Sequence, residues 1–195
     1  MSIQVYVHSA GHLEDVERFG KNDPYARVML DLEDKATFVK TSTKKNAGTN
    51  PEFNQSLLIS SYNADRNEKL YIELLDEETT ADEPIAFAAI PLNQVKSSPN
   101  QILKGKFDLY TADGKQRGTI TLTIAILAFG QEQHSHDAGG QEIKGYSEID
   151  TEQQKRIKSL QNKERAGDLA VAAAIGGGLF AAKSALGGKE EKKEA

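Results

Sequence analysis

Apolar and polar residues alternate in short runs up to about residue 129. In the clearest run, residues 118–127, Ile120, Leu122, Ile124 and Ile126 alternate with threonine and alanine. A period of two predicts a strand with one buried face. Similar or β-branched runs, separated by turn-forming residues, occupy residues 3–8, 25–30, 37–42, 53–59, 69–74, 85–90 and 106–109. About eight strands at this spacing predict an all-β, antiparallel sandwich.

The pattern changes after Phe129. Residues 130–149 are rich in Gly, Gln, His and Ser, which predicts a flexible linker. Residues 150–166 are predicted to form a short helix, because Thr151 and Gln154 have capping-box spacing. Ile157 and Leu160 give this helix a thin apolar stripe.

Residues 167–188 form an apolar segment rich in Ala and Gly, followed by a charged tail over residues 189–195. The uncharged part, residues 169–182, would reach only about 21 Å as a helix, short of a bilayer core of roughly 30 Å. We therefore expect a segment that lies at a membrane interface or self-associates, rather than a spanning helix. A flexible tail is the alternative.

Composition and charge limit the classes of function that the chain can have. The chain has 195 residues, a net charge of -5 and no cysteine. The mild negative charge argues against a nucleic-acid partner, and the lack of cysteine excludes disulfides and thiolate chemistry. No signal peptide is recognisable, so we expect a cytoplasmic protein. No nucleophile elbow, P-loop or paired catalytic constellation is present, so we expect no enzyme.

Two predicted loops collect carboxylates. One holds Glu14, Asp15, Glu17 and Asp23, and the other extends from Asp76 to Glu83. Calcium requires several hard oxygen ligands, which loops converging at one end of a sandwich can supply. Solvated acidic loops that bind nothing are the alternative.

The segment Gly20-Lys21-Asn22-Asp23-Pro24-Tyr25 resembles the most recognisable motif of C2 domains. Lys40-Thr41, the run Asn50–Asn54 and the strand from Leu70 to Asp76 extend the resemblance. It implies an eight-stranded C2 β-sandwich over residues 1–129, with the circularly shifted, type II topology. The chain is also similar to small single-C2 proteins of plants and fungi that carry a separate C-terminal tail.

The resemblance implies a calcium site. Its ligand positions fall on Glu17, Asp23, Asp76, Glu78 and Asp82. Glutamate replaces aspartate at two of them and adds a methylene, so the implied site is weak. The resemblance also implies that Arg27, Lys40, Lys44 and Lys45 bind anionic lipid headgroups. Lysines that protect edge strands from aggregation are the alternative for these residues.

These inferences predict a non-enzymatic, peripheral membrane module that binds anionic phospholipids with weak calcium dependence. A protein-interaction adaptor in trafficking, cytokinesis or stress signalling, with a calcium-silent sandwich, is the other hypothesis. In that case residues 167–188 would recruit a protein partner or self-associate.

Overall fold

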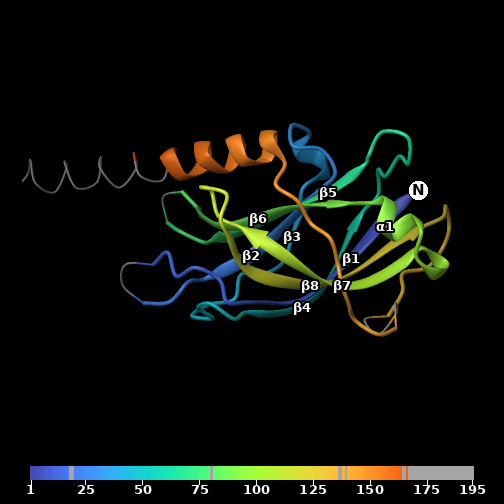
Figure 1. Ribbon diagram of the computed structural model, residues 1–195, viewed down its shortest axis with the longest axis horizontal. Coiled ribbons are helices and arrows are strands. Elements are labelled where there is room, and N and C mark those ends of the chain that lie inside the picture. The colour runs from blue at the N-terminus through green and yellow to red at the C-terminus, as the bar shows by residue number, and fades with distance from the viewer. Residues whose placement is uncertain (18–19, 80, 136–137, 139, 164–165, 167–195) are drawn as a thin grey trace, which may run out of the picture.

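The computed structural model describes residues 1–17, 20–79, 81–135, 138, 140–163 and 166. Eight strands form the body of the molecule (Figure 1). They are β1 (Ser2–Gly11), β2 (Pro24–Met29), β3 (Val39–Lys40), β4 (Glu52–Ile59), β5 (Lys69–Asp76), β6 (Glu83–Pro91), β7 (Ile102–Tyr110) and β8 (Gln116–Leu127). Short elements that the sequence did not predict are α1 (Asn93–Lys96), the 3-10 turns Lys35–Thr37 and Pro99–Gln101, and β9 (Ile143–Lys144).

The strands form two antiparallel layers. One has the order β3-β2-β5-β6 and the other β7-β8-β1-β4. Only Phe87 and Tyr110 pair where β6 meets β7, so the two layers are nearly separate sheets. The first strand lies inside its sheet, between β8 and β4, as the type II arrangement predicts. The predicted C2-like β-sandwich is confirmed.

Inward-facing residues of both sheets make one hydrophobic core. On β5, Leu70, Ile72 and Leu74 point into it, because they are every second residue of the strand. Tyr71, Glu73 and Leu75 therefore face outward. Yet Glu73 and Leu75 are almost completely buried. Another segment of the chain must therefore cover the outer face of this sheet.

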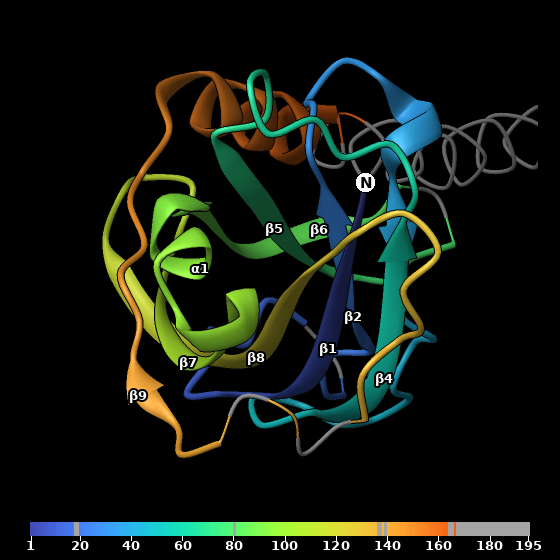
Figure 2. The same cartoon turned by 90° about the vertical axis from the view of Figure 1, so that its right-hand side faces the viewer.

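A helix over residues 151–163 covers that outer face (Figures 1 and 2). Ile157 is fully buried, and Gln153 donates from Nε2 to the carbonyl oxygen of Ile72 at 2.9 Å. The predicted helix is present, but its cap differs from the prediction. The carboxylate of Asp150, not the hydroxyl of Thr151, accepts from the backbone N–H groups of Glu152 and Gln153, both at 3.0 Å.

Part of the predicted linker is bonded to the sandwich. Strand β9 pairs in parallel with β7, and Ala89 and Glu148 exchange backbone hydrogen bonds of 3.0 and 2.9 Å. Gly145 lies so close to Phe107 that a β-carbon there would come within 2.2 Å of the ring. The glycine that suggested a flexible linker instead allows the chain to pass over an aromatic side chain.

The prediction for residues 118–127 was wrong in one respect, because β8 is buried on both faces. Thr121, Thr123 and Ala125 are buried as well as the isoleucines. Residues that follow the strand return over this face: His134 exchanges hydrogen bonds of 2.7 and 2.9 Å with the side chain of Gln4, which is paired with Ala125. Hydroxyl groups satisfied by neighbours, such as Thr123 with His8 at 2.8 Å, make this burial possible.

The predictions for residues 167–188 and 189–195 concern a region outside the described residues. Within the part of the chain that is described, no helix combines the length and apolar character needed to cross a membrane.

Candidate metal and membrane site

The candidate site lies where the β1–β2 and β5–β6 loops meet at one end of the sandwich. Asn22 fixes the first loop, since its buried side chain accepts from the N–H groups of Val16 and Glu17 and donates to the carbonyl oxygen of Glu14, over 3.0, 3.3 and 2.8 Å. The two loops are joined directly by a 3.1 Å hydrogen bond from Glu77 N–H to the carbonyl oxygen of Asp23. The described parts of the two loops are therefore bonded to each other and within the first loop.

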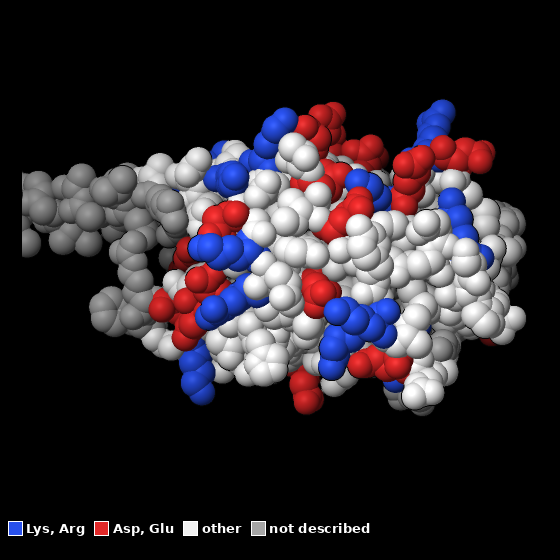
Figure 3. Space-filling view, viewed as in Figure 1, with Lys and Arg blue, Asp and Glu red and all other residues white. Residues whose placement is uncertain are grey.

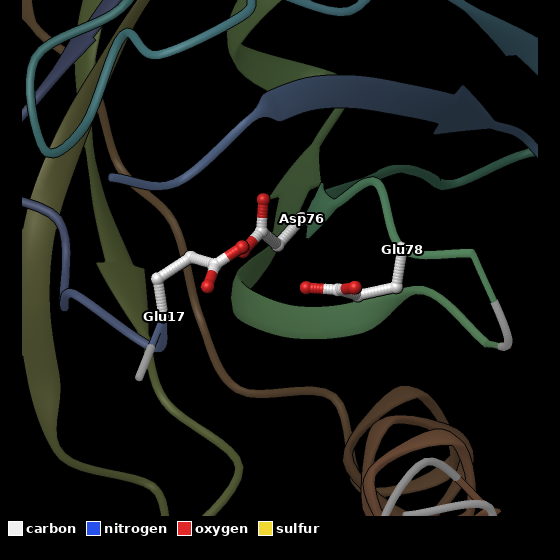
Figure 4. A group of neighbouring side chains, drawn as sticks. All are labelled: Glu17, Asp76 and Glu78. Atoms are coloured by element: carbon white, nitrogen blue, oxygen red, sulfur yellow. The ribbon is translucent and has the colours of Figure 1, made fainter. Parts of the chain in front are cut away.

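Three of the five predicted ligands come together. Glu17, Asp76 and Glu78 each offer a carboxylate oxygen, and these oxygens lie within 4.8 Å of one another. Figure 4 shows the three side chains converging from the first loop, the end of β5 and the loop that follows it. Two oxygens that bind one Ca²⁺ at about 2.3–2.6 Å can be at most about 5 Å apart. The spacing therefore fits a single calcium ion.

Asp76 is the central carboxylate of this group. Its Oδ1 accepts a 2.5 Å hydrogen bond from the backbone N–H of Asp23, whereas its buried Oδ2 has no hydrogen-bond partner. Burial, followed by repulsion from Glu17, Glu78 and Asp23, raises the pKa of Asp76 to about 6. A buried, unpartnered carboxylate oxygen among other carboxylates is what a bound cation would satisfy.

Asp23, also a predicted ligand, is outside this group of three. Its Oδ1 accepts a 2.6 Å hydrogen bond from the N–H of Asn46, and its Oδ2 lies 3.0 Å from Lys45 Nζ. The Asn46 hydrogen bond and then Lys45 hold the pKa of Asp23 below its usual value. Lys45, predicted to bind headgroups, is thus paired within the site.

Asp82 is not in the group either. Its Oδ2 accepts a 2.6 Å hydrogen bond from the hydroxyl of Tyr25, and its Oδ1 lies 3.3 Å from the N–H of Glu78. Burial and this carboxylate raise the pKa of Tyr25 well above its usual value. The structure therefore gives Asp82 a role in shaping the loop that carries Glu78.

The other predicted headgroup residues lie on β2, on β3 and just beyond. Arg27 donates to the buried Glu73 from Nε and Nη2 at 2.8 and 2.5 Å, so its charge is neutralised. Lys40, opposite Arg27 in the sheet, lies with Nζ 4.5 Å from the ring centroid of Tyr25. Lys44 is half-buried in the following loop. Figure 3 shows basic and acidic side chains interspersed on one face of the molecule rather than separated by sign.

The sequence analysis gave no role to Asn22 or Glu73, and it placed Glu77 in the acidic loop without assigning it a partner. A glutamate in the apolar run Leu70–Leu75 was a visible signal, because a charge at such a position requires a buried partner. Nothing in the sequence marked Asn22 as the residue that holds Glu17, since that contact depends on the turn of the loop.

More than half of the sequence is matched by a family model. The model is described as C2 domain and matches residues 1–109. The chain belongs to the C2 domain family. The helix over residues 151–163 lies beyond the matched part, although it packs on the C2 sandwich.

One relative matches about two thirds of this chain. A calcium-dependent lipid-binding protein of Arabidopsis thaliana is 27% identical over 135 residues, which cover 66% of this chain and 25% of that protein. The chain thus spans about a quarter of that relative's length.

Solved structures share the fold. The C2 domain designated A of plant Extended Synaptotagmin 1 matches with a TM-score of 0.54 and 23% identity, over 67% of this chain and 96% of that one. A calcium-bound structure of the two C2 domains, designated A and B, of Extended-Synaptotagmin 2 matches with a TM-score of 0.51 and 20% identity, over 64% and 44% of the two chains. At these identities the likeness shows the C2 fold.

Proposed function

We propose that this protein is a peripheral membrane module whose loop end binds anionic phospholipids with the help of a weakly held calcium ion. The observation that carries the proposal is the convergence of Glu17, Asp76 and Glu78 around a buried carboxylate oxygen that has no hydrogen-bond partner. The name of the Arabidopsis relative, which describes calcium-dependent lipid binding, supports it.

The mechanism is electrostatic. Without a cation, carboxylates at the loop end repel an anionic bilayer and one another. A calcium ion held by Glu17, Asp76 and Glu78 would neutralise this charge and offer open coordination positions to lipid phosphate oxygens. Two of the three ligands are glutamates, whose side chains are longer and less fixed than aspartate. We therefore expect a low calcium affinity.

Basic residues add a contribution that does not depend on calcium. Lys40 is exposed and Lys44 half-exposed, and each lysine near an anionic surface contributes about 1 kcal/mol at most. Arg27 contributes less in this state, because Glu73 neutralises it. We expect these residues to strengthen membrane binding without replacing the calcium-dependent contact.

Sedimentation of the full chain with vesicles tests the proposal. Phosphatidylserine-containing vesicles should bind the protein in calcium and bind much less in chelator, while phosphatidylcholine vesicles should bind little in either. Asp76→Asn should remove the calcium-dependent part. Equal binding in calcium and chelator would reject the calcium role, and no binding to anionic vesicles would favour the protein-adaptor hypothesis.

A further inference from the structure

The carboxylates at the loop end form two sets that differ in their partners. Glu17, Asp76 and Glu78 make the candidate metal group. Asp23 and Glu77, one from each acidic loop, instead share a single ammonium group: Lys45 Nζ lies 3.0 Å from Asp23 Oδ2 and 2.8 Å from Glu77 Oε2. Lys45 therefore links the two acidic loops through one ammonium group.

The backbone on both sides of Lys45 is bonded to the loop end. The N–H of Lys44 donates to the carbonyl oxygen of Pro24 at 2.9 Å, and the N–H of Gly48 donates to that of Asn22 at 3.0 Å. Thr43 donates from its hydroxyl to Glu77 Oε1 at 2.8 Å. The loop over residues 43–48 is thus fixed to the first acidic loop on both sides of Lys45 and contacts the second through Thr43.

We propose that Lys45 is a tethered cation that competes with calcium: while the N–H of Asn46 holds Asp23 Oδ1, Lys45 holds Oδ2 out of the metal group, and calcium gains this oxygen as a ligand only by displacing Lys45. This inference rests on the proposed function, whose calcium site it refines. The physical basis is that an ammonium ion and Ca²⁺ repel each other and require the same carboxylate oxygens. Lys45 therefore sets the calcium affinity, and its release leaves a free ammonium group at the membrane-facing end.

Calcium titration calorimetry on the full chain tests the competition. Lys45→Met should tighten calcium binding roughly three- to tenfold, since exposed ion pairs are individually weak but two are lost and one ligand is gained. Lys44→Met is the matched control, because the titration contains no lipid for Lys44 to bind: it removes the same charge from the preceding position, and Lys44 forms none of the ion pairs found among the described residues. Its effect should be less than about twofold, because only long-range repulsion changes.

A double variant isolates the role of Asp23. If Lys45 acts by withholding Asp23, Asp23→Asn should weaken binding in the Lys45→Met background far more than in the wild-type chain. Equal effects of Asp23→Asn in both backgrounds would overturn the inference, as would equal calcium affinities of the Lys45→Met and Lys44→Met variants.

Amine labelling gives a readout that does not depend on affinity. Acetylation of Lys45 by an N-hydroxysuccinimide ester, followed by mass spectrometry, should be at least about twofold faster in calcium than in chelator, since the amine is no longer held between the carboxylates of Asp23 and Glu77. Lys44 should change little. If the wild-type chain binds calcium but Lys45 labelling is unchanged, the inference fails and the proposed function stands. If neither the wild-type chain nor Lys45→Met binds calcium, both fail.

Discussion

Arg156 donates from Nε to Glu73 Oε1 at 2.9 Å, although 83 positions separate the two residues in the sequence. Glu73 is fully buried and accepts from Arg27 through its other oxygen. The two guanidinium groups lie 5.1 and 5.6 Å from the ring centroid of Phe38. A single carboxylate thus joins β2, β5 and the helix over residues 151–163.

Arg156→Ala should destabilise the protein. The buried carboxylate would lose one of two charged donors, at a cost of about 1.5–3 kcal/mol. We expect the melting temperature to fall by roughly 3–10 °C in thermal denaturation followed by circular dichroism. Lys155→Ala is the control on the exposed side of the helix, and it should change the melting temperature by less than about 2 °C. Equal effects of the two substitutions would contradict a structural role for the Arg156–Glu73 pair.

The helix should be required for a stable sandwich. A chain ending at residue 149 loses the fully buried Ile157, and it loses Gln153 and Arg156, which bond to Ile72 and Glu73 on β5. A chain ending at residue 163 keeps them. The shorter chain should melt roughly 10 °C or more below the longer one, because burial of the isoleucine side chain alone contributes about 1.5–3 kcal/mol. Identical melting curves would show that the helix is only loosely attached.

The sequence predicted the strands more reliably than their surroundings. The run at residues 69–74 correctly predicted a strand, and Leu70, Ile72 and Leu74 lie in the core because a strand side chain can face only two ways. The same rule could not show that a distant helix covers the other face. The glycine-rich composition of residues 130–149 predicted a flexible linker, whereas at Gly145 the close approach of Phe107 is what requires a glycine.

The candidate site was predicted in part for a similar reason. Family positions located Glu17, Asp76 and Glu78, which the loops bring within 4.8 Å of one another. They could not show that Asp23 pairs with Lys45 or that Asp82 accepts from Tyr25. Side chains near a common end of the sandwich have several partners within reach, and the choice depends on loop geometry that residue identity does not determine.

Asp76→Asn should stabilise the calcium-free protein at neutral pH. The pKa of Asp76 is about 6 in the folded state against an ordinary value of 3.8, so the folded chain binds the proton more tightly. Stability contributed by this group therefore falls as pH rises from about 4 to 6, by up to about 3 kcal/mol, and stays low above pH 6. Asparagine carries no charge and can still accept the hydrogen bond from Asp23.

Melting temperatures measured at two pH values, and with and without calcium, test this prediction for Asp76→Asn. In chelator at pH 7.5 the Asp76→Asn variant should melt several degrees above the wild-type chain, and near pH 4 the two should agree closely. Calcium should raise the melting temperature of the wild-type chain but not of the variant, since a ligand stabilises only the state that binds it. A variant that is less stable than the wild-type chain at pH 7.5 in chelator would show that the buried charge of Asp76 does not destabilise the folded protein.

Asn22→Ala should weaken calcium binding without removing a ligand. The Asn22 side chain makes three hydrogen bonds to the first loop, two of them to the N–H groups of Val16 and Glu17. Without them Glu17 is no longer held beside Asp76, so we expect calcium affinity to fall several-fold and stability to fall by about 1–3 kcal/mol. Asn50→Ala, which removes a 3.0 Å hydrogen bond to the N–H of His12 at a more exposed position, is the control. Calorimetry on both variants separates the outcomes: an unchanged affinity for Asn22→Ala would mean that Glu17 does not depend on this amide for its place in the site.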